Sequence, residues 1–293
     1  MKGLILVNAY VEKDSYLYQA KRMKEEFGKR GVSCDIIKNN KYSVYIENGN
    51  ILSDYSGYDF VIFWDKDKYI GEMLEKSGLK VFNRPDSILT CDDKMTTHIM
   101  LSNNGIPMPK TYPGILCYSN EHKIQKETFD LIEKKLGYPM ICKHSYGSLG
   151  QGVFLINNRK ELEDISEDVK IVPHLFQQFI SESAGKDLRV IVVGDKVLGG
   201  MIRQSLSNDF KSNIGVGGSG KIYPVSKEVA DMCLKIKNIL NLDYCGIDIL
   251  FGNSGPIVCE VNSNAFFETF EKVTGINVAK EYTDYILKKV SKK

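Results

Sequence analysis

Two carboxylates and an amide follow two apolar runs near the C-terminal end of the chain. Asp248 lies inside the run 246–251, and Glu260 and Asn262 lie at the end of the next run, after the turn Gly-Asn-Ser-Gly. Side chains alternate faces along a strand, so Glu260 and Asn262 share a face. A carboxylate in an apolar strand is costly unless it is paired or binds a cation, and oxygen ligands suit Mg²⁺ bound with phosphates. We predict a metal site here; the alternative is a hairpin with outward polar residues.

A lysine followed by three glycines could bind phosphate. Lys143 ends an apolar run, and Gly147, Gly150 and Gly152 follow, with Ser148 among them. Glycine lets backbone N–H groups approach phosphate oxygens closely, and the lysine adds a point charge. The spacing is not that of a P-loop. The alternative is the flexible tip of a hairpin.

Two arginines lie in a third stretch, which predicts a hairpin turning at Gly194-Asp195. Counting back from a two-residue turn pairs Lys186 with Arg203, which puts Arg189 and Arg203 on opposite faces. We therefore expect only one of them to serve a common site. Arginine suits a planar carboxylate or phosphate, whereas an arginine in a surface ion pair is the ordinary alternative.

The elements that position these residues fall into two parts. Residues 1–88 alternate short apolar runs with one helical pattern, which predicts a small, mainly parallel α/β domain. No G-x-G-x-x-G follows its first strand, so we expect a scaffold rather than a dinucleotide site, and this argues against an NAD(P)-dependent oxidoreductase. Residues 89–293 predict an α+β domain, with helices near 87–102, 121–136, 227–240 and 279–292 and mostly β structure from 137 to 223.

The composition is that of an ordinary globular protein. The 293 residues carry a formal charge of +2 and are 43% hydrophobic, which excludes disorder and gives no support for nucleic-acid binding. Seven scattered cysteines without C-x-x-C spacing imply neither a disulfide framework nor a zinc cluster. No apolar run approaches the length of a membrane span. We expect a cytoplasmic protein without a membrane partner.

Several motifs in one order resemble those of the ATP-grasp ligases, and the RimK-like carboxylate–amine ligases most closely. The resemblance covers about residues 84–285. Its pieces are Asp93-Lys94-x-x-Thr97, Lys143 with its glycine loop, Gln177-Gln-Phe-Ile180, Gly185-x-Asp187-x-Arg189, Met201-x-Arg203, Asn208-Asp-Phe-Lys-Ser-Asn213, Gly217-Gly218, Gly246-Ile-Asp248, Glu260-Val-Asn262 and Thr274-Gly-Ile-Asn-Val. The resemblance implies a two-lobed ATP-grasp fold after the N-terminal domain, with lobe A at about 89–180, including the loop 144–152, and lobe B at about 181–293.

The resemblance also implies roles for individual residues. Residues implied to contact ATP are Lys94, Lys143, Gly147, Ser148, Gly150, Gly152, Gln178, Phe179, Asp187, Lys211 and Asn213. Asp248, Glu260 and Asn262 would hold Mg²⁺ or Mn²⁺, as two ions, and Arg203 would stabilise the transferred phosphoryl group or an oxyanion. Gln178 and Lys211 stand where relatives usually have Glu and Arg. Residues 264–267 replace a usual Pro-Gly near the acceptor, so we expect Phe267 to influence acceptor choice.

The implied reaction activates a carboxylate as an acyl phosphate, which an amine then attacks to give an amide, ADP and phosphate. An amino acid such as glutamate is the expected substrate, with a small carboxylate, a peptide or a protein C-terminus as the other. We also expect a homo-oligomer. The alternative hypothesis is an ATP-binding regulatory module of the same fold that lacks catalysis.

Overall fold

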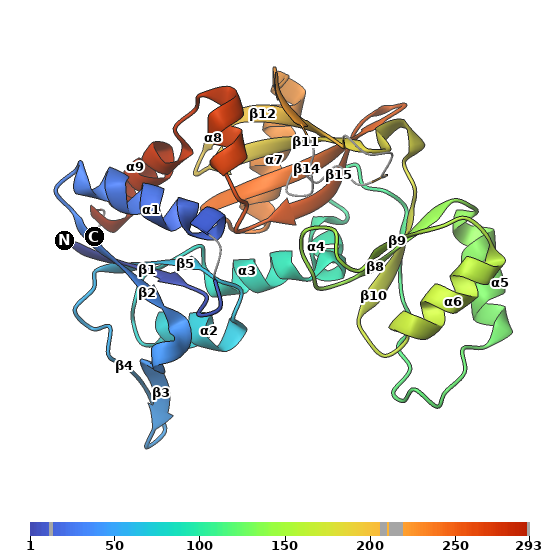
Figure 1. The fold of residues 1–293 in the computed structure, drawn as a ribbon, viewed down its shortest axis with the longest axis horizontal. Helices are drawn as coiled ribbons and strands as arrows, with labels where there is room; N and C mark the ends of the chain where they lie inside the picture. Colours follow the sequence, from blue (N-terminus) through green and yellow to red (C-terminus); the bar gives the residue numbers. More distant parts are fainter. Residues whose placement is uncertain (12–13, 206–209, 211–218, 292–293) are drawn as a thin grey trace.

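The computed structural model describes residues 1–11, 14–205, 210 and 219–291. Within these residues the chain forms a four-stranded parallel sheet, two antiparallel sheets of four and five strands, and a two-stranded hairpin. Helices pack against the sheets (Figure 1). This mixture of a parallel and of antiparallel sheets confirms the α/β and α+β fold class expected from the sequence. None of the described helices is long and apolar enough to cross a membrane.

The N-terminal unit is built on the parallel sheet. Its elements are β1 (Lys2–Val7), α1 (Asp14–Gly28), β2 (Ser33–Lys38), β5 (Phe60–Trp64), α2 (Lys68–Lys76) and β6 (Val81–Phe82), with strand order β2-β1-β5-β6. Strand β1 is buried on both faces, because Ile5 and Val7 pack in the core with α1 while Leu4 and Leu6 pack in the core with α2. This double burial explains the continuous apolar run that predicted the strand.

A small hairpin projects from this unit in a stretch where the sequence predicted no element (Figure 1). It consists of η1 (Asn39–Lys41), β3 (Val44–Glu47) and β4 (Asn50–Ser53). Apart from the buried Val44, its apolar side chains are partly or largely exposed, including Tyr45 and Ile46. The stretch therefore lacked the buried, apolar character by which the other strands were found.

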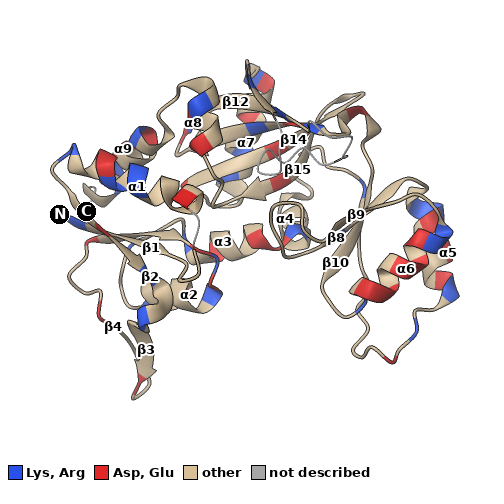
Figure 2. Ribbon diagram, viewed as in Figure 1, with Lys and Arg blue, Asp and Glu red and all other residues tan. Residues whose placement is uncertain are grey.

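The middle unit is an antiparallel sheet with two helices on one face. Its elements are β7 (Thr111–Pro113), α5 (Lys126–Leu136), β8 (Met140–His144), β9 (Val153–Ile156), α6 (Arg159–Val169) and β10 (His174–Gln178), with strand order β7-β10-β8-β9. Phe129 of α5 and Leu162 of α6 pack on Met140, Cys142 and other apolar residues of the sheet. Helix α6 was not predicted, since its sequence is mostly charged and buries only a narrow apolar stripe. Figure 2 shows residues of both charge signs interspersed along α5 and α6.

The third unit is a five-stranded antiparallel sheet. Its elements are η2 (Ser181–Ser183), β11 (Lys186–Val193), β12 (Lys196–Gln204), β13 (Ser219–Tyr223), α7 (Lys227–Ile239), β14 (Tyr244–Gly252), β15 (Gly255–Asn262), α8 (Glu268–Thr274) and α9 (Val278–Ser291), with strand order β13-β12-β11-β14-β15. Helix α7 covers one face through Val229, Cys233 and Ile236. The other face meets α8 and α9 at one end, and its opposite end carries charged residues.

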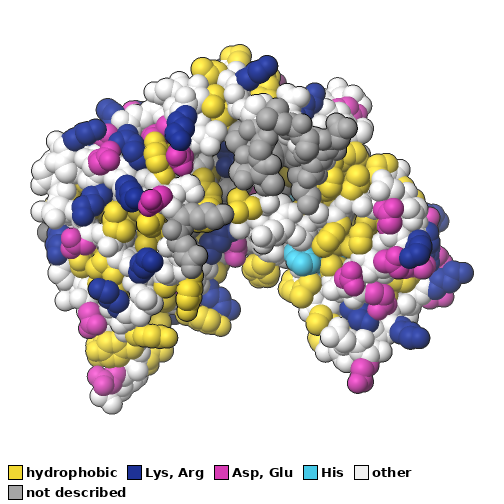
Figure 3. All heavy atoms as spheres, viewed as in Figure 1, with side chains coloured by type: hydrophobic (Ala, Val, Ile, Leu, Met, Phe, Trp, Pro, Cys, Tyr) yellow, Lys and Arg dark blue, Asp and Glu magenta, His cyan; other side chains and the backbone are white. Residues whose placement is uncertain are grey.

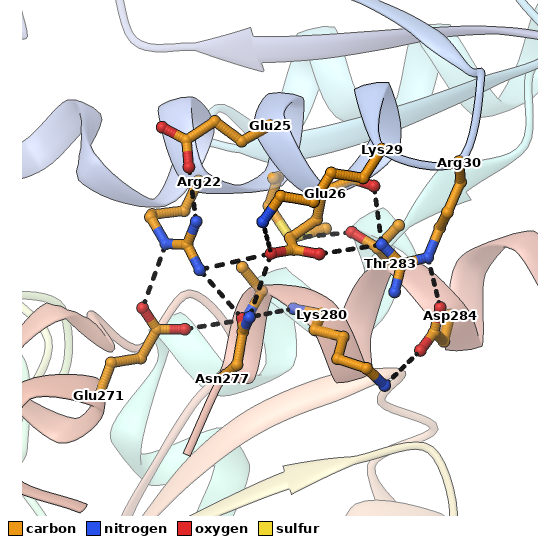
Figure 4. Close-up of polar contacts among 12 residues, drawn as sticks. Arg22, Glu25, Glu26, Lys29, Arg30, Glu271, Asn277, Lys280, Thr283 and Asp284 are labelled. Atoms are coloured by element: carbon orange, nitrogen blue, oxygen red, sulfur yellow. Dashed lines mark hydrogen bonds and ion pairs between the residues drawn. The ribbon is translucent and has the colours of Figure 1, made fainter. Parts of the chain in front are cut away.

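The N-terminal unit and the five-stranded sheet share one apolar core. Met23 and Phe27 of α1 lie in the same cluster as Ile191 of β11 and Tyr282 of α9. Polar contacts also link α1 with the segment from α8 to α9 (Figure 4). Asn83 also joins the two units, because its side chain donates to the backbone oxygens of Tyr244 and Ser263, each at 2.8 Å. The boundary at residue 88 stays a prediction, and the apolar core is continuous across it.

One predicted helix is two helices in the structure. The sequence predicted a single helix over 87–102, whereas the structure has α3 (Pro85–Asp92) and α4 (Lys94–Leu101). Asp93 separates them with an extended backbone, and its side chain accepts hydrogen bonds from the backbone N–H groups of Met95 and Thr96. An aspartate at this position caps the start of the second helix. The break places Lys94 at the first position of α4.

Candidate functional site

The five-stranded sheet gathers its charged residues on one face. Directly opposed pairs on neighbouring strands are Asp187–Arg203, Arg189–Asp248, Asp248–Glu260 and Gly246–Asn262. Opposed residues share a face, as do residues two apart on one strand. Asp187, Arg189, Arg203, Asp248, Glu260 and Asn262 therefore all belong to the same face, although they come from four strands.

The shared position of the two arginines corrects the expectation from the sequence, which put them on opposite faces. The turn is as predicted, since Val193 opposes Lys196, but Lys186 opposes Gln204 rather than Arg203. A β-bulge at Ile191/Val192 moves the register by one residue, with Leu198 as the extra residue on β12. A shift of one residue exchanges the faces of a strand. Arg203 thereby lies opposite Asp187, on the face that also carries Arg189.

The buried arginines and aspartates form one hydrogen-bonded network. Arg189 contacts Asp248 through Nε and through Nη2, the latter at 2.8 Å from Oδ2. Arg203 donates from Nε to Oδ1 of Asp187 at 2.7 Å, and its Nη2 contacts Asp187 and lies 2.9 Å from Asp248 Oδ2. Burial alone would raise the pKa of Asp248, but the two arginines hold it below its usual value. Asp248 is therefore an anion at neutral pH, and Arg203 stays charged.

Glu260 and Asn262 complete the set predicted to hold metal. Asn262 Nδ2 lies 3.3 Å from Asp248 Oδ2, and Glu260 is part-exposed, with Oε1 3.6 Å from Lys94 Nζ. Two carboxylates and an amide oxygen are the hard donors that Mg²⁺ takes, so the residues fit the ion chemically. The arginines occupy both oxygens of Asp248, which makes Glu260 the more open ligand. No cluster of three or more His, Cys, Asp or Glu side chains suited to a metal occurs among the described residues.

Two lysines from different elements approach this face. Lys94, at the start of α4, donates from Nζ to the Gly147 oxygen at 2.8 Å and lies near Glu260. Lys143, at the end of β8, donates from Nζ to Gln177 Oε1 at 2.8 Å and lies 3.5 Å from Cys259 Sγ. The middle sheet, helix α4 and strand β15 thus meet at one place. Two ammonium groups beside a carboxylate make this junction suited to an anionic ligand.

The glycine loop lies over the start of α4. Gly147, Gly150 and Gly152 all have positive φ values, of 139°, 76° and 66°. At Gly152 a Cβ atom would stand 2.5 Å from the ring of His144, so a side chain there would collide as well as strain the backbone. The Lys94 backbone N–H donates to the Ser145 oxygen at 2.9 Å. The loop, with the exposed Ser148 near its tip, is thus placed beside Lys94; its closure over phosphates stays a prediction.

The structure describes only some of the other residues that were predicted to contact the nucleotide. The Gln178 backbone N–H donates to the Lys110 oxygen, and the Phe179 ring lies 6.3 Å from the ring of Phe210. Asp187 is buried against Arg203. Lys211 and Asn213 lie outside the described residues.

Three residues beside Lys143 were given no role in the site by the sequence analysis. Gln177 holds Lys143 and also donates from Nε2 to Thr111 at 2.9 Å. His98 is buried next to Gln177, and burial, with the charge of Lys143, lowers its pKa to about 4. Cys259 is the extra residue of a second β-bulge, at Asp248/Ile249. Gln177 could have been noticed because it directly precedes the predicted site residue Gln178. No sequence pattern marked His98 or Cys259.

Phe267 does not fit the role expected from the sequence. Its side chain is fully buried and packs edge-on against Trp64, Tyr18 and Tyr244. A residue enclosed by aromatic rings on the shared core contributes to stability rather than to contact with a substrate. Its neighbour Phe266 is 44% exposed and lies against Tyr16.

Sequence comparisons match this chain to known proteins over most of its length. A family model described as the RimK-like ATP-grasp domain matches residues 91–286. A probable alpha-L-glutamate ligase of Shewanella loihica is 34% identical over 96% of this chain and 95% of its own. Beta-citrylglutamate synthase B of Danio rerio and N-acetylaspartylglutamate synthase A of Homo sapiens are each 36% identical over 76% of this chain. The chain spans about half the length of these two synthases, 54% and 56%.

Solved structures agree with the fold. A D-alanine–D-alanine ligase of Bacillus anthracis superposes with a TM-score of 0.75 over 99% of this chain and 97% of that chain. A RimK-domain ATP-grasp protein of Sphaerobacter thermophilus gives 0.71 over 97% and 99%. Both are 18% identical to this chain, so the likeness shows the fold alone.

Proposed function

Because the chain belongs to the RimK-like ATP-grasp family, we propose that it is an ATP- and Mg²⁺-dependent ligase that joins a carboxylate to an amine. The observation that carries the proposal is that Lys94 lies beside Glu260 and that Lys143 lies beside Cys259, the residue before Glu260. These groups come from α4, β8 and β15, and they lie beside the buried network of Arg203 and Asp248. Cations next to a carboxylate that can hold a metal are what the transfer of a phosphoryl group between anions requires.

The first step places a substrate carboxylate against the γ-phosphate of ATP. Both groups are anions, so Lys94 and Lys143 lower the repulsion between them. Glu260 and Asn262, with Asp248, would hold the metal, which when bound neutralises phosphate oxygens. The carboxylate oxygen forms a bond to the γ-phosphorus as the bond to the ADP oxygen breaks. The product is an acyl phosphate.

In the second step the neutral amine attacks the acyl carbon, the bond from that carbon to the phosphate oxygen breaks, and inorganic phosphate leaves with the proton that the nitrogen gives up. Negative charge develops on the carbonyl oxygen during this attack. Arg203 already uses Nε and Nη2 on Asp187 and Asp248, whereas its Nη1 donates to no described residue. We assign Nη1 to the developing oxyanion. The glycine loop beside Lys94 would keep water from the acyl phosphate.

The relatives guide the choice of substrates. Proteins named as glutamate ligases and as glutamate-containing synthases suggest L-glutamate as the amine substrate, with a small carboxylate or a peptide C-terminus as its partner. We propose that the protein acts in the cytoplasm, in keeping with its seven free cysteines, and that it forms a homo-oligomer.

The test is the release of ADP and phosphate from Mg²⁺-ATP across pairs of amino acids and carboxylates, with mass spectrometry of the products. Equal amounts of phosphate and a new amide are the expected result. ADP without an amide would indicate that the acyl phosphate was lost to water because the amine was absent. Bound ATP without ADP in every combination, peptides included, would contradict the proposal and favour a regulatory module.

A further inference from the structure

Three polar residues lie together at the carboxyl edge of the N-terminal parallel sheet. Asn8, Asn39 and Asp65 each come directly after a strand, β1, β2 and β5. Asn8 Nδ2 lies 3.3 and 3.2 Å from the two Asp65 oxygens, Asn39 Nδ2 also contacts Asp65, and the Lys66 backbone N–H donates to it at 2.7 Å. The chain passes from β1 to β2 on one side and then to β5 on the other. Open α/β sheets bind ligands at such a change of direction.

Asp65 differs from the carboxylates of the site on the five-stranded sheet. The donors to its carboxylate are all neutral, namely the Asn8 and Asn39 side chains and the backbone N–H groups of Lys66 and Asp67, and no cationic nitrogen among the described residues lies within 4.0 Å of it. The nearest lysine in sequence, Lys66, is paired with Asp92 instead. Burial, together with the charge of Asp67, raises the pKa of Asp65. A part-buried carboxylate without a cation is costly, so this edge favours a positively charged ligand.

The edge is joined to the candidate active site through Asn264. Asn264 Nδ2 donates to the Asp65 backbone oxygen at 2.7 Å, and Asn264 follows the predicted metal ligand Asn262 by two residues. The other atom of the same amide group, Oδ1, is buried and accepts no hydrogen bond in the described structure. Gln19 is 3% exposed, and its Oε1 is likewise without a donor, while its Nε2 faces the Ala265 oxygen. Every unmet side-chain group at 264 and 19 is thus an acceptor.

We propose that this edge binds the amino group of the amino-acid substrate while it is an ammonium ion, before it loses the proton that must leave for attack, with Asp65 as its charge partner and Asn264 Oδ1 as a further acceptor. An ammonium group has three N–H donors and no acceptor, which matches a carboxylate and an amide oxygen. The proposal rests on the proposed function, because it names the substrate group that the ligase would recognise. It also changes the interpretation of the N-terminal unit from a scaffold to a part of the site.

A purely structural role for Asp65 makes a different prediction. If Asp65 only ties the ends of three strands together, its loss lowers stability and weakens all ligands alike. If it binds ammonium, its loss removes the preference for an amino acid over the matching 2-hydroxy acid. The ratio of these two affinities is therefore the quantity to measure.

The experiment uses the full chain with Mg²⁺ and a non-hydrolysable ATP analogue. Each of the twenty amino acids is titrated calorimetrically, and the amino acid bound most tightly is compared with its 2-hydroxy acid. We expect the wild type to prefer the amino acid at least about tenfold, as for a charge-assisted contact. Asp65→Asn should bring the two affinities within about twofold of each other, and Asn264→Ala should lower the ratio about threefold. Asp67→Asn is the matched control, because it removes a neighbouring charge while asparagine still caps α2.

Outcomes for this proposal and for the proposed function are separable. A ratio unchanged in Asp65→Asn, or equally reduced in Asp67→Asn, would overturn the role of Asp65. So would the failure of every amino acid to bind while the nucleotide analogue binds normally. Failure to bind the nucleotide would instead count against the proposed ligase function. If Asp65→Asn does not fold, Asn264→Ala supplies the ratio, since it leaves the Asp65 carboxylate and its donors in place.

Discussion

Two regions of the molecule bury carboxylates among lysine and arginine side chains. They differ in whether those cations are bound to carboxylates or to neutral groups. Between α1 and α9, Glu26 is bound by Lys29 at 2.8 Å and Arg30 at 2.9 Å, and Arg22 lies 3.6 Å from it (Figure 4). At the sheet, Lys143 donates to neutral partners, Gln177 and Cys259. At the helix interface the cations are thus bound to a carboxylate, whereas in the site Lys143 has only neutral partners and can bind an anionic ligand.

The comparison shows that residue type alone does not separate a structural cluster from a functional one. Both regions contain two or more arginines against buried acids. At the helix interface, hydrogen bonds from Lys29, Asn277 and Arg30 outweigh burial and lower the pKa of Glu26 to about 2. The site lies where the middle sheet and the five-stranded sheet meet, and Figure 3 shows the molecule hollowed between its two lower parts.

The largest effect should come from removing a site carboxylate. Glu260→Ala takes away the open ligand for the metal, and we expect kcat to fall about 1000-fold, or about 4 kcal/mol. Stability should change little, because Glu260 is part-exposed and contacts Lys94 only at 3.6 Å. Glu268→Ala is the matched control, with similar exposure, 27% against 28%, and a lysine partner. Wild-type turnover in Glu260→Ala would remove Glu260 from the metal site.

At the helix interface the corresponding change should affect folding and spare the chemistry. Glu26→Ala leaves Lys29 and Arg30 without their shared carboxylate. The lowered pKa of Glu26 corresponds to a loss on the order of 3 kcal/mol in the free energy of unfolding. Denaturant unfolding measures this loss, and nucleotide affinity at low temperature should match the wild type. Weakened ATP binding in a folded Glu26→Ala protein would erase the distinction between the two regions.

Removing Lys143, the cation with neutral partners, should weaken nucleotide binding. Lys143→Ala should raise the KM for ATP about 10- to 30-fold, which corresponds to about 1.4 to 2 kcal/mol for a charge-assisted contact. Lys143→Arg keeps the charge and should recover part of the affinity. Steady-state kinetics at varied ATP measures both variants. An unchanged KM in Lys143→Ala would place Lys143 outside the phosphate site.

The smallest effect is a dependence of stability on pH. Glu26 has a lowered pKa in the folded protein, so its contribution is present above the unfolded value of about 4.5 and is lost as pH falls toward 2. Between about pH 5 and 3.5 the wild type should lose about 1 kcal/mol through this group. Glu26→Gln cannot titrate and should lack this part of the pH dependence. Parallel curves for the two proteins would show that Glu26 is not the group responsible.

The sequence was sufficient to predict the position of a residue where that position depends on neighbours along the chain. The turn at Gly194-Asp195 was placed correctly, and Glu260 and Asn262 share a face as expected. It was insufficient where an extra residue changes the register. Val197 and Leu198 are both apolar and part-buried, so nothing in their types marks the bulge.

The break between α3 and α4 was missed for a different reason. Apolar residues continue at helical spacing through it, and the capping Asp93 was visible only as a polar residue in that pattern. Asp93 followed by Thr96 could have indicated a helix start, since both Asp93 oxygens bond to groups within three residues. Phe267 was misplaced because its core partners come from distant parts of the chain, including Trp64.

The single extra residue in β12 has a consequence for how such chains can diverge. Its loss would leave the pairs on either side unchanged, because Val197 already opposes Val192 and Gly199 already opposes Ile191. A homologue without Leu198 would therefore pair regularly and still hold Arg203 opposite Asp187. One further residue in this part of β12 would instead turn Arg203 to the far face unless a second bulge formed. The hairpin can thus lose one position and keep the site, but it cannot gain one at the same cost.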